Sequence, residues 1–366
     1  MRELFYVLGL FIVIVIGNTI IVAQTNMKPP VPKKETKVTK IHGYEIKDDY
    51  FWMRSAKDPK TGKVRPEVEK YLEEENAYTE TYMKPHQPFA DALYKEMLGR
   101  IKQTDLSVPY KMGDYWYYTK TEEGKQYPVY VRAKSREGKN EQILLDQNAM
   151  AEGFEYFSIG EFDLSEDGNF LAFSTDTTGY RQYTLQIKDL KTGMLLPEKI
   201  ERVTSAAWSN DGKYLFFVQE HPETKRSDKF FRHTVGTDKN ELLLEEKDVL
   251  FNLGVGKTRD DKMIILGAFA KTSRESRYIP ADQPMAQWKV ILPREENHEY
   301  SADHYNGEFY ITTNKSAENF RVIRAPVADP SEKNWRLGPN QARLRLEQGP
   351  ERQRRQILSR RRRGPG

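Results

Sequence analysis

The sequence predicts a mainly β protein: an incomplete β-propeller of about five blades, preceded by two N-terminal α-helices. Two observations carry this prediction. A unit of strand, Asp-Gly-type turn and strand recurs, with turns at positions 167, 211, 260 and 306 and therefore steps of 44, 49 and 46 residues. The units also contain further short alternating segments, which indicates four antiparallel strands per unit, the pattern of a propeller blade.

The composition is that of a folded globular chain. Of the 366 residues, 31% are charged, 38% are hydrophobic and 12% are aromatic. These fractions exclude a polytopic membrane protein and a wholly disordered chain. The chain contains no cysteine, which excludes disulfide frameworks, thiolate zinc sites and cysteine nucleophiles.

The net charge of +4 is set by the end of the chain. Residues 337–366 hold nine Arg and two Glu and so contribute +7, which leaves −3 for the remaining 336 residues. A slightly acidic chain with one basic tail does not indicate a nucleic-acid-binding domain. We therefore predict no nucleic-acid partner.

Residues 1–24 have the pattern of a secretory signal peptide. Arg2 precedes an apolar run over residues 4–16, and Ala23 offers a small residue for cleavage. The alternative is an uncleaved membrane anchor over residues 4–22, which is just long enough to span a bilayer. We expect an exported protein, periplasmic or secreted, with stable membrane association only if this segment is not cleaved.

Residues 25–101 are predicted to form an extended segment followed by two helices. Pro66 suits the first position of a helix, and apolar residues recur at helical spacing after it. Apolar residues that repeat every four positions indicate the second helix: Phe89, Leu93, Met97 and Ile101. We expect both apolar stripes to pack into a core rather than to bind a ligand.

Residues 102–336 are predicted to form the blades. Clear strand–turn–strand copies are at residues 162–173 and 207–217, and two looser copies follow at residues 260–265 and 306–311. Asp-Gly pairs supply the positive φ angles that tight hairpin turns need. In the first copy, residues 183–187 and 194–196 are the expected third and fourth strands. A β-sandwich is the alternative, but its turns would not carry this longer super-period.

The repeat ends within the last unit. A third strand is expected at residues 320–324, but the composition changes at about Leu337, before a fourth strand. Residues 337–366 contain no Lys, Phe, Tyr or Trp, and a run of four Arg at 360–363 precedes the final Gly-Pro-Gly. We predict an Arg-rich disordered tail of foreign or out-of-frame sequence. Phosphate binding by this tail is the functional alternative.

No catalytic, cofactor-binding or metal-binding residue is recognisable. The chain contains no Gly-x-Ser-x-Gly motif of a hydrolase nucleophile. Residues 254–258, Gly-Val-Gly-Lys-Thr, match a phosphate-binding loop only in part, and we expect a blade turn there. His298 and His304 are close in sequence, but their spacing suits a metal site poorly.

Several segments resemble the prolyl oligopeptidase family, and oligopeptidase B within it. The matching segments are Ile41-His42-Gly43, residues 48–54, residues 71–78, residues 99–110, residues 121–128, residues 145–148 and residues 174–179. Together they spread over roughly residues 30–336, and motifs of this length rarely arise by chance.

The resemblance implies a seven-bladed propeller that caps an α/β-hydrolase domain, with the N-terminal helices packed on the hydrolase. It implies a serine peptidase that cleaves short peptides after Arg or Lys, with the propeller excluding folded proteins. In that family the catalytic Ser, Asp and His lie C-terminal to the propeller. None can be assigned in this chain, so we expect the chain alone to be inactive. The alternative is a stand-alone propeller that binds or scaffolds other molecules.

Overall fold

The structure, a computed structural model, describes residues 28–54 and 61–338. The predicted signal segment 1–24 and almost all of the predicted tail 337–366 lie outside the described residues. The chain divides into two compact units, Met1–Lys102 and Gln103–Gly366, and each is described by itself. No helix within the described residues is both long and apolar enough to cross a membrane.

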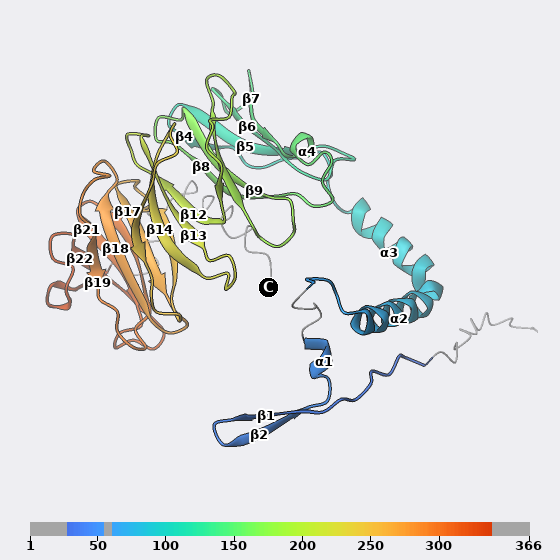
Figure 1. Cartoon of the computed structure of the whole chain (residues 1–366). Helices are drawn as coiled ribbons and strands as arrows, with labels where there is room; N and C mark the ends of the chain where they lie inside the picture. Colours follow the sequence, from blue (N-terminus) through green and yellow to red (C-terminus); the bar gives the residue numbers. More distant parts are fainter. Residues whose placement is uncertain (1–27, 55–60, 339–366) are drawn as a thin grey trace, which may run out of the picture. The chain divides into compact units, whose positions relative to one another are not determined.

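The first unit contains the two predicted helices. Its elements are β1 (Lys37–Ile41), β2 (Tyr44–Asp48), α1 (Phe51–Arg54), α2 (Pro66–Met83), the 3-10 turn η1 (Lys84–His86) and α3 (Gln87–Gly99). β1 and β2 form an antiparallel hairpin (Figure 1). Trp52 of α1 is buried; its indole N–H donates to the Lys33 carbonyl at 2.9 Å and its ring meets Tyr71 edge to face. This contact joins α1 to α2.

The apolar stripe of α3 is exposed, contrary to the expected core packing. Phe89 is 72% exposed, Ile101 just after the helix is 62% exposed, and Leu93 and Met97 are also exposed. In α2 only Val68 is buried. An amphipathic helix buries its apolar stripe only against a second layer of structure, and the described part of this unit offers α3 none.

The second unit consists of five antiparallel sheets, which we call blades 1 to 5. Blade 1 is β3 (Asp105–Leu106), β4 (Tyr110–Met112), β5 (Tyr115–Thr121), β6 (Val129–Ala133) and β7 (Gln142–Asp146). Blade 2 is β8 (Ser158–Leu164), β9 (Phe170–Asp176), β10 (Thr184–Asp189) and β11 (Ile200–Glu201). Blade 3 is β12 (Val203–Trp208), β13 (Tyr214–Glu220), β14 (Ser227–Thr234) and β15 (Asn240–Glu245).

The last two blades follow the same order. Blade 4 is β16 (Asn252–Lys257), β17 (Met263–Phe269), β18 (Arg274–Pro280) and β19 (Lys289–Leu292). Blade 5 is β20 (Tyr300–Tyr305), β21 (Glu308–Thr313), β22 (Arg321–Pro326) and β23 (Arg336–Leu337). Two short helical turns, α4 (Gln147–Met150) and η2 (Glu332–Asn334), lie between strands. In blades 2 to 5 the strands pair in chain order, which confirms the predicted mainly β propeller architecture.

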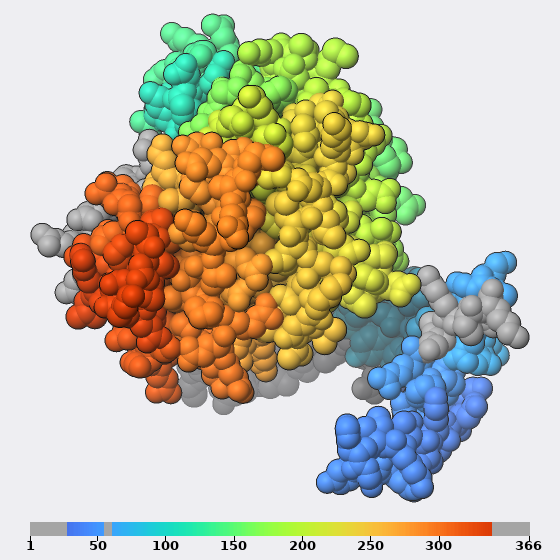
Figure 2. All heavy atoms as spheres, turned by 60° about the vertical axis from the view of Figure 1, so that its left-hand side comes forward, coloured from blue at the N-terminus to red at the C-terminus, as the bar shows by residue number. Residues whose placement is uncertain are grey.

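The hydrophobic cores lie between neighbouring blades. Trp208, Leu215 and Phe217 belong to the core between blades 2 and 3, whereas Phe216 and Phe230 belong to the core between blades 3 and 4. Successive blades adjoin in the space-filling view, where yellow, orange and red residues lie side by side (Figure 2). Within the described residues, no strand of blade 1 packs extensively against blade 5, so the five sheets form an open series.

Two strand predictions need correction. Residues 194–196 are not the fourth strand of blade 2, because only Leu195 forms a bridge, to Lys188. Pro197 cannot donate a ladder hydrogen bond, and the ladder resumes beyond it at β11. Blade 5 does have a fourth strand, the two-residue β23, which pairs with β22.

The recurring turns share one hydrogen-bond arrangement. In blade 3, the Ser209 hydroxyl donates to an Asp211 carboxylate oxygen at 2.6 Å and accepts from the Tyr214 backbone N–H at 3.0 Å. Ser165 in blade 2 and Thr258 in blade 4 make the same two contacts with their own turns. A buried hydroxyl therefore closes each of these three turns.

The backbone of these turns departs from the expected two-residue hairpin. Only one residue in each takes a positive φ: Gly168 at 66°, Gly212 at 66° and Asp261 at 58°. In blade 5, by contrast, Asn306 and Gly307 both have positive φ, at 51° and 78°. The tight turn with two positive φ angles thus occurs in blade 5, and the other three turns are longer loops.

Replacing the turn hydroxyl tests this arrangement. Ser209→Ala leaves the Tyr214 N–H and the Asp211 carboxylate without their shared partner, so the free energy of unfolding should fall by about 1–3 kcal/mol. Ser209→Thr keeps the hydroxyl, as Thr258 does in blade 4, and should lose less of the free energy of unfolding than Ser209→Ala does. Urea denaturation followed by circular dichroism measures both. Equal losses for the two variants would contradict the assigned role.

The packing between blades 2 and 3 depends on Trp208. Its side chain is fully buried, stacks on Phe170 and donates its indole N–H to the Asp163 carbonyl at 3.1 Å. Trp208→Ala should lower the free energy of unfolding by about 3–5 kcal/mol. Tyr180→Ala, at a side chain that is 78% exposed, is the control and should stay within about 0.5 kcal/mol. A Trp208→Ala variant as stable as the parent protein would contradict the assigned core between blades 2 and 3.

Candidate functional site

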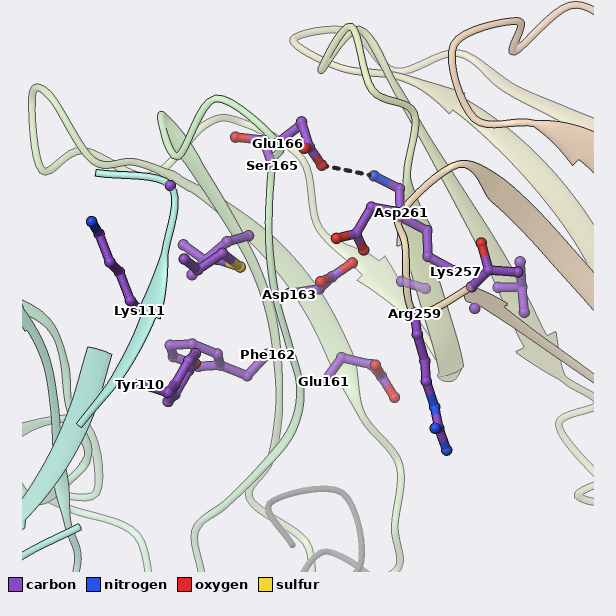
Figure 3. A pocket seen from close by; sticks show the side chains of 17 residues that line it. Tyr110, Lys111, Glu161, Phe162, Asp163, Ser165, Glu166, Lys257, Arg259 and Asp261 are labelled. Carbon is purple, nitrogen blue, oxygen red and sulfur yellow. Dashed lines mark ion pairs between the residues drawn. The ribbon is translucent and has the colours of Figure 1, made fainter. Parts of the chain in front are cut away.

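The inner strands of the propeller surround a cavity of about 630 Å3 (Figure 3). One inner strand from each of blades 1 to 4 contributes to its wall: β4, β8, β12 and β16. Its charged lining residues are Lys111, Glu161, Asp163, Glu166, Lys257, Arg259 and Asp261. Because both signs of charge occur, the cavity can contact both anionic and cationic groups of a ligand.

A β-bulge in β8 sets the direction of two of these carboxylates. The register between β8 and β9 shifts around Gly160 and Glu161, and the Glu161 N–H donates to the Ser174 hydroxyl at 2.8 Å. A Cβ at Gly160 would lie 2.7 Å from both the Ser174 oxygen and the Tyr183 ring, so only glycine fits this close approach. Glu161 lies in the bulge and Asp163 just beyond it, and both line the cavity (Figure 3).

The basic side chains of the opposite wall are held by acceptors from other blades. Lys257 Nζ donates to Asn210 Oδ1 at 2.6 Å and lies 3.7 Å from Glu166 Oε2. Arg259 Nε lies 3.0 Å from Asp303 Oδ2, and the Arg259 backbone N–H donates to Asp303 Oδ1 at 2.9 Å. These pairs partly neutralise the cationic wall.

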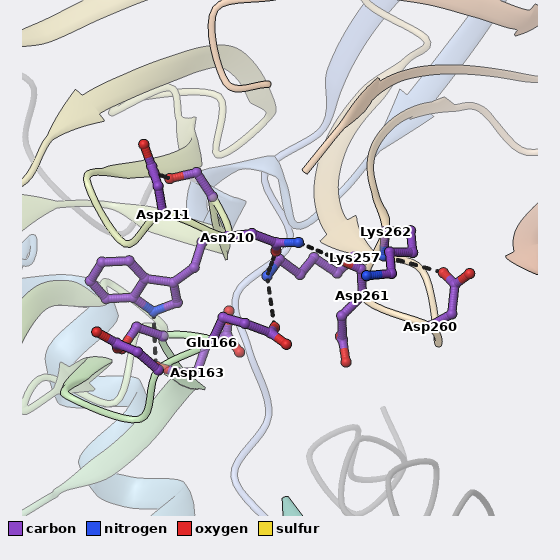
Figure 4. Close-up of polar contacts among 12 residues, drawn as sticks. Asp163, Glu166, Asn210, Asp211, Lys257, Asp260, Asp261 and Lys262 are labelled. Atoms are coloured by element: carbon purple, nitrogen blue, oxygen red, sulfur yellow. Dashed lines mark hydrogen bonds and ion pairs between the residues drawn. The ribbon is translucent and has the colours of Figure 1, made fainter. Parts of the chain in front are cut away.

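Asn210 links blade 3 to blade 4 next to the cavity residue Lys257 (Figure 4). It lies in the turn of blade 3, and its side-chain amide donates to the Asp261 carbonyl of blade 4 at 3.0 Å. Its backbone N–H donates to the Ala281 carbonyl, also of blade 4, at 2.8 Å. With Glu166 from blade 2 and Lys257 from blade 4, it forms a polar chain across the rim.

The Gly-Val-Gly-Lys-Thr segment is not the blade turn that we expected. Residues 254–257 belong to strand β16, and only Thr258 enters the turn. No helix follows the segment, so it lacks the helix N-terminus of a phosphate-binding loop. Lys257 was therefore not predicted as a cavity residue, although its place at the end of an innermost strand is the signal that could have identified it.

The imidazole of His298 contacts the hydroxyl of Thr313, and this pair has a structural role in the interior of the fold. His298 Nε2 lies 2.8 Å from Thr313 Oγ1, and Glu295 Oε2 lies 3.8 Å from His298 Nδ1. Both His298 and Thr313 are buried, and burial lowers the pKa of the His298 imidazole. Thr313 Oγ1 also accepts from the Lys315 N–H at 3.0 Å. A hydroxyl without solvent access cannot attack a substrate, so this contact holds strands together.

His304 of blade 5 also makes a contact with blade 4. Its Nδ1 lies 2.7 Å from Asp260 Oδ2 of blade 4, and its Nε2 accepts from the Gly307 N–H at 3.2 Å. Both ring nitrogens are therefore engaged within the fold. Among the residues that the structure describes, no group of three or more His, Cys, Asp or Glu is arranged to hold a metal ion.

Comparison with known proteins places the chain in one family. The family described as prolyl oligopeptidase, N-terminal beta-propeller domain, matches residues 29–362. That match extends past Leu337, where the composition changes, and the foreign origin of residues 337–366 stays a prediction.

Curated relatives are peptidases of about twice the length. Dipeptidyl aminopeptidase BI of Pseudoxanthomonas mexicana is 39% identical over 333 residues, which cover 86% of this chain and 45% of the relative. Protease 2 of Moraxella lacunata is 33% identical over 319 residues, 84% of this chain and 45% of the relative. The chain thus spans less than half the length of these relatives.

Solved structures show the same fold. Oligopeptidase B from Leishmania major superposes with a TM-score of 0.76 at 24% identity, over 86% of this chain and 46% of that one. Oligopeptidase B from Trypanosoma brucei gives a TM-score of 0.75 at 23% identity, over 86% and 47%. The predicted resemblance is therefore confirmed: this chain belongs to the prolyl oligopeptidase family and contains the N-terminal β-propeller portion of that family.

Proposed function

We propose that this chain is the propeller portion of a serine-type oligopeptidase that cleaves short peptides after Arg or Lys. Its family membership and its peptidase relatives, named dipeptidyl aminopeptidase BI and protease 2, support a role in peptide hydrolysis. In this proposal the catalytic residues lie in a partner domain, and this chain controls which substrates reach them.

The size of the cavity is the observation that carries this role. About 630 Å3 is within the usual range for small-ligand sites and accommodates a few residues of extended peptide. A folded domain of 100 residues has a radius of gyration of about 13 Å and cannot enter. A cavity walled by inner strands therefore selects for short, extended peptides.

We also propose that the protein is exported. The support is the apolar run over residues 4–16 with Ala23 after it, a pattern typical of a secretory signal peptide. Retention of residues 4–22 as an anchor is the alternative. Mass spectrometry of the mature protein distinguishes the two, because cleavage after Ala23 makes Gln24 the first residue.

A stand-alone binding propeller is the second candidate. Blade 5 has four paired strands and a buried core against blade 4 that contains Tyr278, Phe309 and Ile323, so the series is well packed up to its last sheet. This function requires a monodisperse monomer that melts cooperatively without a partner. Aggregation of the purified chain, as expected from sheet faces without neighbours, would count against it.

A domain exchange tests the proposed function. The first half of the Pseudoxanthomonas mexicana relative is replaced by residues 28–338 of this chain, which the 39% identity makes feasible. The chimaera should hydrolyse dipeptide anilides that have a free amino terminus and Arg or Lys before the scissile bond. It should cleave folded proteins at least about tenfold more slowly than short peptides, because only the latter fit the cavity.

Two controls accompany this exchange. A matched anilide with Glu in place of Arg should be cleaved poorly, and the unfused chain should release no product from either substrate. Hydrolysis by the unfused chain would contradict the assignment of catalysis to a partner domain. Equal cleavage of folded proteins and short peptides would contradict the selecting role of the propeller.

A further inference from the structure

We propose that Glu166 and Lys257 form a size-selecting strap across the inner-strand cavity. Glu166 lies in the turn after β8 of blade 2, and Lys257 ends β16 of blade 4. Both residues line the cavity. While the two charges are paired, the strap narrows the space, and when they separate, a larger group can enter. The inference rests on the proposed function in one respect, that peptides are what the cavity admits, and it assigns their size limit to two named residues.

The pair joins two blades that are not neighbours. β12 of blade 3 lies between β8 and β16 and contacts both strands, and Ala206 of β12 lines the same cavity. Lys257 Nζ nevertheless lies 3.7 Å from Glu166 Oε2, as the dashed lines in Figures 3 and 4 mark. A direct contact between blades 2 and 4 has to pass in front of the inner strand of blade 3. It therefore occupies part of the space that these blades enclose.

The Lys257 end of the strap is fixed. Its side chain is only 13% exposed, and Nζ donates to Asn210 Oδ1 at 2.6 Å. Asn210 is held in turn, because its backbone N–H donates to the Ala281 carbonyl at 2.8 Å and its side-chain amide donates to the Asp261 carbonyl at 3.0 Å. These hydrogen bonds keep the ammonium group in place whether or not the Glu166 carboxylate is beside it.

The Glu166 end of the strap is free to move. Its side chain is 51% exposed, and 3.7 Å from Lys257 Nζ is too long for a hydrogen bond, so charge alone attracts the two groups. The backbone of the turn stays closed when the carboxylate moves, because Ser165 contacts Asp167 and Phe170. An ion pair with a half-exposed partner is weak, and salt weakens it further. Both the paired and the separated arrangement are therefore populated, and an entering peptide can part the strap.

A single introduced thiol in the full chain tests the strap. The chain contains no cysteine, so Gly256→Cys supplies a unique probe. Gly256 lines the cavity, and a Cβ at this position meets no atom within 4 Å. The thiol is labelled with two neutral reagents, N-ethylmaleimide and a maleimide that carries a long polyethylene glycol chain. The ratio of the bulky to the small reagent's rate, followed by mass spectrometry, measures how easily a large group enters.

Salt and loss of the Glu166 charge should have the same effect. The rate ratio should rise about two- to fivefold between about 0.01 M and about 1 M sodium chloride, because the screening length falls from about 30 Å to about 3 Å. Glu166→Gln in the same background should raise the ratio by a similar factor at low salt and remove its dependence on salt. Glu166 is half-exposed in a turn, so this variant should fold.

Two controls isolate the strap from general effects. Glu308→Gln removes a pair of similar length, 3.3 Å to Arg324, in blade 5 and outside the cavity, and should change neither the ratio nor its salt dependence. Ser301→Cys places the thiol at an exposed position of blade 5, in place of Gly256→Cys, and reports the effect of salt on the reagents themselves.

A rate ratio that responds neither to salt nor to Glu166→Gln would overturn the strap, and so would an equal response to Glu308→Gln. If Glu166→Gln does not fold, the salt series on the Gly256→Cys protein decides by itself. The labelling requires no peptidase activity. An unresponsive ratio therefore contradicts the strap alone, whereas an inactive chimaera in the domain exchange contradicts the proposed function alone.

Discussion

The structure of this propeller depends on strands that bury both of their faces at once. Along β13, Leu215 and Phe217 enter the core between blades 2 and 3, while Phe216 and Val218 enter the core between blades 3 and 4. An isolated antiparallel sheet needs an apolar face packed against a second layer, and here the free energy of folding comes from apolar area buried between sheets. A shift of one residue in the register of β13 would exchange the two sets, so each strand fixes the position of both neighbouring blades.

This constraint explains which parts of the fold could be predicted from the sequence. Strands buried on both faces and joined by polar turns leave a regular period, and the spacing of the turns was sufficient to predict the blades. Local effects were not visible at that level. The fourth strand of blade 2 lies beyond Pro197, at β11. The apolar stripe of α3 has helical spacing, but it is exposed because no second layer covers it. The spacing of apolar residues shows that one face of an element is apolar, but it does not show which other element covers that face.

The candidate site was harder to predict, because its residues come from different blades. Glu166, Asn210 and Lys257 are separated by 44 and 47 residues, about one blade each. Equivalent positions of successive blades come to lie around the same rim, so the period itself held the information that these three side chains meet. The spacing of the turns predicts the number of blades, and alignment of equivalent positions between blades predicts which side chains meet at the rim. The same alignment places Lys257 at the end of the inner strand β16 and not in a turn.

The distribution of polar groups separates structural chemistry from binding chemistry. His298 and His304 are both buried. One ring nitrogen of His298 contacts Thr313, and both ring nitrogens of His304 have partners within the fold. These side chains therefore join strands and blades. The charged residues of the inner strands have no further sheet to pack against, because the inner strands are the last layer before the cavity. Packing between sheets therefore restricts the residue type least at these positions, and binding of a ligand can restrict it most. Under the proposed function, contact with a peptide would therefore fall to the inner-strand side chains, because the cores lie between the blades.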